Sequence, residues 1–289
     1  MIRNYKRGNQ SSCVIPVNGN EILGKIMAMI VINPLLKDVI GHLISFAGVE
    51  MYVEDVADGS TLSDEMSKLK TVMPILDIKE PSNGALKRVY IAEDETEIAN
   101  YRSDKFVLNK PLPEKTLMPD MTFDNPEIVI IGVNDKLPYV LQSLSCFKEE
   151  YKEVNIHVTL MDTTGHEEEL HKYCSDPAYA DIIAPEPIII KNIYKPFDDI
   201  DDSLLEKTNS ALLLSDDHDR SDHIDEKPLL FWNNLEKVKP GECIIEILDM
   251  QNKDICNNKQ TIISDFFISC MLAQLGKQPV RLDVIKDLL

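Results

Sequence analysis

The feature that most constrains this chain is a strongly apolar strand that ends in a glycine-poor turn. Residues 127–131 read Glu-Ile-Val-Ile-Ile, and Gly132 follows them directly. A dinucleotide-binding domain continues at this point as G-x-G-x-x-G, because bare backbone must approach a pyrophosphate at the N-terminus of the next helix. Here the turn 132–137 reads Gly-Val-Asn-Asp-Lys-Leu, so side chains stand where the phosphate would lie. The sequence therefore predicts the scaffold without its phosphate chemistry, which favours a regulatory or assembly module over a dehydrogenase.

The net charge of the chain indicates which classes of binding partner are unfavourable. Lys and Arg number 30 and Asp and Glu number 49, which gives a net charge of −19. Such a charge disfavours nucleic acid and anionic membrane surfaces. The most apolar early run, residues 22–32, contains Lys25 and is far shorter than the about 20 residues that span a bilayer. We therefore expect no nucleic-acid partner and no direct membrane insertion, and the six cysteines without a C-x-x-C pair indicate a cytoplasmic chain.

The first part of the chain predicts connecting helices followed by a small lobe. Apolar residues recur at helical spacing in residues 1–48, with a break at Asn33 because the residue before Pro34 is pushed out of the helical region. A small α+β lobe is expected over 49–110, and the proline-rich stretch 111–126 is predicted to be a linker. The elements expected in the small lobe are a strand at 50–54, an amphipathic helix at 62–73, and strands at 89–92 and 105–108.

Residues 127–289 alternate apolar strands with amphipathic helices. The expected strands are 128–131, 155–161, 187–190, 211–214 and 243–248, and the expected helices are 137–147, 167–173, 229–235 and 262–275. Such alternation predicts a parallel sheet covered on both faces. The predicted fold class is thus α/β: a Rossmann-like doubly wound parallel sheet, preceded by a helix-rich crossover and a small α+β lobe.

The variant turn supplies candidate cofactor-binding residues. Gly132, Asn134 and Asp135 lie in the turn, and Asp162 ends the second strand of the unit, where a dinucleotide-binding domain places an acidic residue on the ribose. The loss of two glycines favours instead a pocket without a nucleotide, with Asp162 as a helix cap or loop residue. The first interpretation makes an NAD(P)- or nucleotide-binding protein or oxidoreductase the alternative function.

The acidic run 216–226 contains the candidate metal site. Its candidate ligands are Asp216, Asp217, Asp219 and Asp222. Calcium takes several carboxylate and carbonyl oxygens at about 2.4 Å, but the EF-hand pattern fails here because no glycine occupies its sixth position and no glutamate closes the loop. The competing interpretation is a solvated cap, in which Ser215 or Asp219 begins the next helix. No cofactor is firmly indicated, and Ca²⁺ is the candidate ion.

The sequence lacks three common motifs of enzyme active sites. It contains no G-x-S-x-G and no P-loop. The histidine pairs 166/171 and 218/223 are spaced by five residues, whereas a zinc pair on one helix face is spaced by four. We therefore expect that the chain is not an enzyme.

Several short stretches share the order and spacing of one family. Residues 130–137 resemble its opening strand, glycine and polar turn, and residues 211–217 resemble its fourth strand with an acidic exit. Residues 245–249 resemble its fifth strand, and residues 263–273 resemble the ISDY-like start of the apolar helix that follows. Residues 28–48 look like its crossover helices. Together these stretches resemble the RCK (regulator of K⁺ conductance) cytosolic module, most closely that of Castor/Pollux-type ion channels.

The resemblance implies a gating or ligand-sensing module of a cation channel, with potassium and calcium as the associated ions. The pore helices and selectivity filter of that family have no counterpart here, so the implied module does not itself form a pore. It would act at the cytosolic face of a membrane with a pore-forming subunit. RCK modules pair through crossover helices, which implies self-association through residues 22–46. A scaffold that binds no ligand is the second alternative.

Overall fold

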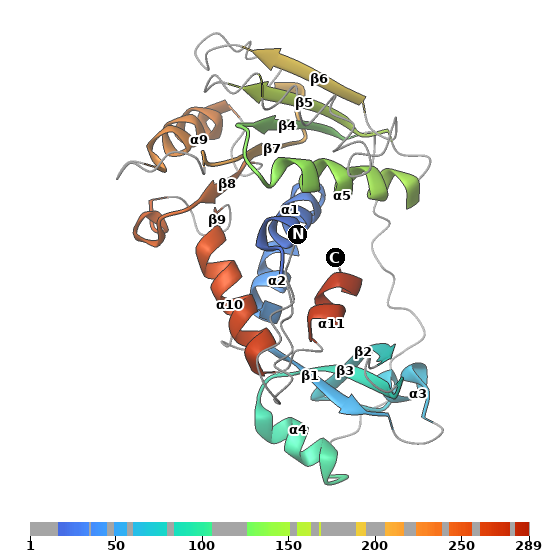
Figure 1. Cartoon of the computed structure of the whole chain (residues 1–289). Helices are drawn as coiled ribbons and strands as arrows, with labels where there is room; N and C mark the ends of the chain where they lie inside the picture. The colour runs from blue at the N-terminus through green and yellow to red at the C-terminus, as the bar shows by residue number, and fades with distance from the viewer. Residues whose placement is uncertain are drawn as a thin grey trace, which may run out of the picture.

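The computed structural model describes residues 17–34, 36–44, 49–56, 60–79, 84–105, 126–150, 155–162, 168, 189–194, 206–216, 224–238, 243–255, 261–277 and 281–288. These residues form a large sheet at one end of the molecule and a small sheet at the other (Figure 1). Helices from both ends of the chain lie between the two sheets (Figure 1).

Six parallel strands form the large sheet, in the order β6-β5-β4-β7-β8-β9. The strands are β4 (Glu127–Ile131), β5 (His157–Asp162), β6 (Ile189–Tyr194), β7 (Ser210–Leu213), β8 (Cys243–Ile247) and β9 (Thr261–Ile263). Counted along the chain within this sheet, the order is 3-2-1-4-5-6, which is that of a doubly wound dinucleotide-binding fold. The predicted Rossmann-like α/β class is therefore confirmed.

Helices cover both faces of this sheet, because successive side chains of each buried strand point to opposite faces. The covering helices are α1 (Gly19–Ile32), α5 (Leu137–Glu150) and α9 (Glu226–Val238). Ile128 and Ile130 of β4 pack in the core shared with α1 and α5. Val129 and Ile131 pack in the separate core shared with α9. The continuous apolar run in β4 is thus explained by burial on both faces.

Helix α1 begins at an asparagine cap and crosses α5 at very short range. The side chain of Asn18 accepts a hydrogen bond from Glu21 N at 3.3 Å, and its amide donates to the Tyr139 hydroxyl at 2.9 Å. A Cβ at Gly24 would lie 2.6 Å from Tyr139 Cβ and 2.8 Å from the Lys136 carbonyl oxygen. Only glycine allows this approach, so Gly24 sets the depth at which α1 packs on α5.

The small lobe is an antiparallel sheet in the order β1-β3-β2, with two short helices beside it (Figure 1). Its elements are β1 (Glu50–Asp55), α3 (Leu62–Met66), β2 (Val72–Lys79), β3 (Leu86–Ala92) and α4 (Glu95–Arg102). The side chain of Thr61 caps α3, and that of Asp94 caps α4. Helix α4 lies in a segment for which the sequence predicted no element.

The predicted helix over 62–73 is wrong beyond Met66, since strand β2 begins at Val72. Burial alternates at the start of β2, with Val72 and Pro74 facing inward and Met73 exposed. Pro74 is tolerated because β2 is an edge strand and its register with β3 shifts between Pro74 and Leu76. Pairing with β3 therefore overrides the helical spacing of the apolar residues.

A buried arginine holds the small lobe together. The Arg88 guanidinium donates to Asp77 in a bidentate manner, at 2.5 Å from Nε and 2.8 Å from Nη2, and lies 3.1 Å from Glu65. Glu65 also accepts from the Tyr90 hydroxyl at 2.6 Å, and that hydroxyl bonds to Tyr101. Every partner comes from this lobe, so the network serves its own α+β packing.

Further helices from both ends of the chain pack between the two sheets (Figure 1). These are α2 (Leu36–Ile44), α10 (Ser264–Lys277) and α11 (Arg281–Leu288). Helix α10 contacts α1, α2 and α11, and Lys277 at its end lies 3.6 Å from Glu50 of β1. The helix predicted at 262–275 begins instead at Ser264, because residues 262–263 belong to β9. Of the strand predicted at 105–108 and the helix predicted at 167–173, all but residues 105 and 168 lie outside the described residues.

Candidate functional site

The first candidate site is the point where the strand order of the large sheet reverses, between β4 and β7. In open α/β sheets, ligands bind at this point, outside the carboxyl ends of the strands. The predicted turn 132–137 leaves β4 here, and residues 214–216 leave β7 beside it. The side chains at this point therefore decide whether a nucleotide can enter.

Gly132 is required by the scaffold itself. It has a φ of +97°, and an added Cβ would lie 2.6 Å from the Leu214 carbonyl oxygen. Its N–H donates to Met161 O at 2.9 Å, while Leu214 N donates to Ile131 O at 2.8 Å. The glycine thus lets the exits of β4, β5 and β7 approach one another.

Asn134 lies in the variant turn at this switch point and is held by three hydrogen bonds of its side chain. Its amide nitrogen donates to the Ser215 carbonyl at 2.9 Å and to Glu246 Oε2 at 2.9 Å. Its amide oxygen accepts from Lys136 N at 3.0 Å. The side chain is fully buried, so it joins the exits of β4, β7 and β8 beneath the surface.

Glu246 is a charged residue at the centre of this network. Its Oε1 lies 3.1 Å from Lys136 Nζ and accepts from the Ser264 hydroxyl, and its Oε2 accepts from Ser215 N at 3.2 Å. The side chains of Glu246 and Lys136 are 0% and 4% exposed. A buried carboxylate is tolerated only when it is paired and hydrogen-bonded, and both conditions are met. We call Asn134, Lys136, Ser215, Glu246 and Ser264 the closing network.

Asp225 fixes the adjoining loops. Its carboxylate accepts from Leu248 N, Asp249 N and the Asn252 side chain, each at 2.9 Å. Its backbone carbonyl accepts from Leu229 N at 3.0 Å, so Asp225 begins α9. The prediction that Ser215 caps this helix is wrong, because the Ser215 hydroxyl donates to Glu246 O at 2.8 Å.

The predicted cofactor residues lie at the ends of the neighbouring strands β4 and β5. Gly132 and Asn134 lie at the switch point, whereas Asp135 between the two buried residues of the turn is exposed. Asp162 is the last residue of β5, which also pairs with β4: Met161 lies opposite Ile131, and Met161 O accepts from Gly132 N at 2.9 Å. The backbone therefore brings the end of β5 beside the turn 132–137, and cofactor binding by these four residues stays a prediction.

The predicted metal ligands are only partly described. Asp216 follows β7 and is half-buried. Asp217, Asp219 and Asp222 lie outside the described residues. Among the residues that are described, no group of three or more His, Cys, Asp or Glu side chains is placed to hold a metal ion.

Sequence reasoning did not identify the role of Lys136, Ser215, Glu246 or Ser264. One signal for it was present: Glu246 interrupts the otherwise apolar β8, which reads Cys-Ile-Ile-Glu-Ile and is buried throughout. Glutamate is almost never fully buried unless it is paired. The partners are 18 or more residues away, so spacing could not indicate them.

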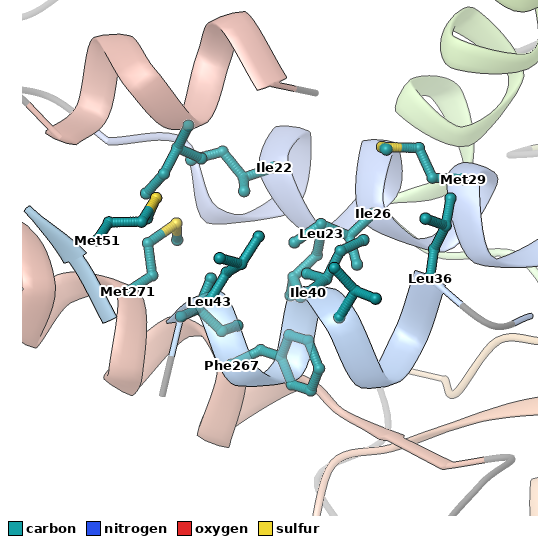
Figure 2. Close-up of a pocket in the computed structure, with 13 residues that line it drawn as sticks. Ile22, Leu23, Ile26, Met29, Leu36, Ile40, Leu43, Met51, Phe267 and Met271 are labelled. Carbon is teal, nitrogen blue, oxygen red and sulfur yellow. The ribbon is translucent and has the colours of Figure 1, made fainter. Parts of the chain in front are cut away.

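A second candidate site is an apolar pocket between α1, α2 and α10 (Figure 2). Its lining also includes Met51 of β1 and Ile285 of α11. It therefore lies where the beginning of the described chain meets its end, between the large sheet and the small one. In the described part of the chain, no helix has the length and apolar character needed to cross a membrane.

Comparison with solved structures gives a likeness in fold. The chain is similar to the human SLO3 gating ring, with a TM-score of 0.63 and 12% sequence identity, and the match covers 92% of this chain and 60% of that one. The chain thus spans less than two thirds of the gating-ring chain. A flavohemoglobin from Malassezia yamatoensis matches with a TM-score of 0.27 and 16% identity, over 71% of this chain and 57% of that one. No protein-family model and no curated protein matches the sequence.

Proposed function

We propose that the chain is a regulatory module of the gating-ring type, which senses a ligand and controls a cation channel without itself forming the pore. The observation that carries this proposal is the likeness to a channel gating ring over 92% of the chain. A match of that extent takes in the helices between the sheets and the small lobe as well as the large sheet. The finer assignment, to an RCK module of the Castor/Pollux type, rests on the sequence resemblance.

The closing network supports a regulatory role over the alternative oxidoreductase. A pyrophosphate at the switch point would displace the Asn134 amide from Ser215 and Glu246, which it bonds at 2.9 Å each. It would also bring negative charge against the buried Glu246 carboxylate, which like-charge repulsion disfavours. We therefore propose that the chain binds no dinucleotide at this point and is not an enzyme.

The proposed assembly uses the outer side of the helices between the sheets. Most apolar residues of α1 are buried within this chain, so they are not free to form an interface. Val39 of α2 and Phe266 and Leu272 of α10 are exposed. We propose that self-association through residues 22–46 uses the exposed side of α2, and that a pore-forming subunit holds the assembly at the cytosolic face of a membrane.

The sensed ligand is proposed to be a cation, with Ca²⁺ as the first candidate. Asp216 marks the start of the acidic run that would supply the oxygen ligands. K⁺ is the second candidate, because it is the ion associated with the RCK family that the sequence resembles. The net charge of −19 attracts any cation weakly, so a specific site must be separated from this general effect.

The first measurement is the thermal unfolding of the purified chain titrated with Ca²⁺, Mg²⁺, K⁺, Na⁺, NAD⁺ and NADH. The second is the mass of the chain in solution, determined by light scattering. A ligand at a hundredfold excess over its Kd adds about 2.7 kcal/mol of stability. We expect a saturable shift with one cation, loss of that shift in Asp216→Asn, no shift with dinucleotides, and a mass above that of the monomer.

A saturable shift with NAD⁺ or NADH would overturn the proposal and favour the oxidoreductase. A monomer that responds to none of these ligands would also overturn it and leave a ligand-free scaffold. An equal shift with Mg²⁺ and Ca²⁺ that persists in Asp216→Asn would indicate general charge screening, which contradicts specific cation sensing.

A further inference from the structure

The apolar pocket between α1, α2 and α10 has no polar side chain in its lining (Figure 2). It encloses about 170 Å³ and opens partly to solvent. Figure 2 shows Leu23 and Ile26 of α1 close to Ile40 of α2, with Phe267 of α10 beside them and Leu36 of α2 next to Met29. Five elements from both ends of the chain thus build one concave hydrocarbon surface.

The size and chemistry of the pocket define the class of ligand. An engineered cavity of about 150 Å³ lined by Leu, Ile and Phe stays dry and accepts benzene. The present pocket, at about 170 Å³, has room for a similar group of roughly six to eight carbon atoms by that comparison. A water molecule inside would lack the two to four polar partners that it needs. The pocket therefore favours a short hydrocarbon segment over a polar metabolite.

One cationic side chain, Lys37, belongs to α2, the helix that supplies five of the lining residues. Lys37 follows the lining residue Leu36, and it precedes the lining residues Ile40 and Ile44 by three and seven positions, which is the spacing of one helix face. Lys37 is half-buried, and this burial lowers the pKa of its ammonium group. The exposed Asp38 beside it in the sequence is the acidic group that acts on it electrostatically.

No described residue forms an ion pair with Lys37, which sets it apart from Lys25, Lys87, Lys136 and Lys277. A half-buried ammonium group gains from a nearby anion because desolvation is then offset by charge pairing. The pocket thus combines a hydrocarbon cavity with a cation on the same helix, and the complementary molecule has an alkyl chain that ends in a carboxylate.

We propose that this pocket binds a medium-chain fatty acid, with the alkyl tail between α1, α2 and α10 and the carboxylate paired with Lys37. The bound tail would bridge helices from the two ends of the described chain. The site is independent of the channel proposal, because its test measures binding of a small molecule by the chain alone.

The first test is a calorimetric titration at physiological ionic strength with the series butanoate, hexanoate, octanoate and decanoate. Each buried methylene is worth about a fourfold gain in affinity. We expect the affinity to rise by that factor per carbon up to roughly eight carbons, the size the cavity comparison allows, and then to level off. Octanol should bind more weakly than octanoate, and octylammonium more weakly still.

Two substitutions separate the tail from the head of the ligand. Lys37→Met should weaken octanoate at least tenfold, down to the affinity of octanol, and leave octanol unchanged. Leu43→Phe fills the lining and should abolish binding of both compounds. Leu230→Phe is the matched control, because Leu230 is on α9, is 59% exposed and is not part of the lining. It should bind octanoate as the parent does.

The proposal is overturned if octanoate does not bind, if affinity is independent of chain length, or if Lys37→Met leaves octanoate binding unchanged. It is also overturned if light scattering shows a dimer that Leu43→Phe and octanoate both dissociate, since the occupant would then be a second copy of the chain. Unfolding midpoints of the three variants within a few degrees of the parent establish that each one is folded.

Discussion

The buried ion pair between Lys136 and Glu246 gives the sharpest prediction. The two charged groups are 3.1 Å apart and almost fully shielded from solvent. Replacing Glu246 by glutamine keeps the size and one acceptor oxygen but leaves the Lys136 ammonium buried without a counter-charge. Breaking a buried pair in this way costs about 3–5 kcal/mol. We expect Glu246→Gln to lower the free energy of unfolding by that amount.

A double-mutant cycle also requires the variant in which the cation, Lys136, is replaced. In Lys136→Met, the carboxylate still accepts hydrogen bonds from Asn134, Ser215 and Ser264, so we expect a loss at the lower end of the same range, about 3 kcal/mol. In the double variant both charges are gone, and the glutamine oxygen still accepts from Asn134 and Ser215. Replacing a whole buried pair is often close to neutral. The double variant should therefore be more stable than Glu246→Gln alone.

Urea unfolding at pH 7 followed by far-UV circular dichroism measures all four proteins, with the m-value as the check that the unfolding transition is unchanged. The control is Glu21→Gln, which removes a pair of 3.6 Å on the surface of α1 and should cost no more than about 0.5 kcal/mol. The reasoning is refuted if Glu246→Gln costs less than about 1 kcal/mol, or if the double variant loses the sum of the two single losses.

Four further substitutions test three glycines and a helix cap. Gly132→Ala should cost about 2–3 kcal/mol in urea unfolding, because its φ of +97° and the nearby carbonyl oxygen both exclude a Cβ; a loss below 1 kcal/mol contradicts this. Gly24→Ala should destabilise by about 1–3 kcal/mol through its clash with α5, whereas Gly41→Ala, in open space on α2, should stabilise by about 0.5–1 kcal/mol. Hydrogen bonds from the Thr96 side chain and the Glu97 backbone lower the pKa of Asp94 below 3.8. Its stabilisation of α4 is therefore present above that value and lost as the pH falls through the lower folded value. Asp94→Asn should show a smaller loss of stability between pH 5 and pH 2, and an unchanged loss refutes the assignment.

The large sheet could be predicted because its strands are buried on both faces. Such strands read as continuous apolar runs, so residues 128–131 and 211–214 were located to within one residue. The alternation with helices then limits the connections to right-handed parallel crossovers. The pattern did not predict strand β9. This strand has only the residues Thr261–Ile263, and the apolar start of α10 follows it directly, so the two read as one apolar segment.

The small lobe was harder because its strands are partly exposed. In residues 62–73, the apolar side chains have helical spacing, yet the chain leaves the helix at Met66 and pairs with β3 from Val72 onward. Long-range pairing decided the outcome, as it commonly does for short segments of mixed pattern. The closing network was hidden for a related reason, because Asn134 meets Glu246 across 112 positions of sequence.

Helix α1 connects the two candidate sites physically. One side of it, at Gly24, lies against the Lys136 carbonyl and the first turn of α5, where the closing network begins. Another side supplies Ile22, Leu23 and Ile26 to the apolar pocket. Since the approach at Gly24 is too close for any Cβ, α1 cannot move toward α5, and a ligand that wedges the pocket open must displace α2 or α10 instead.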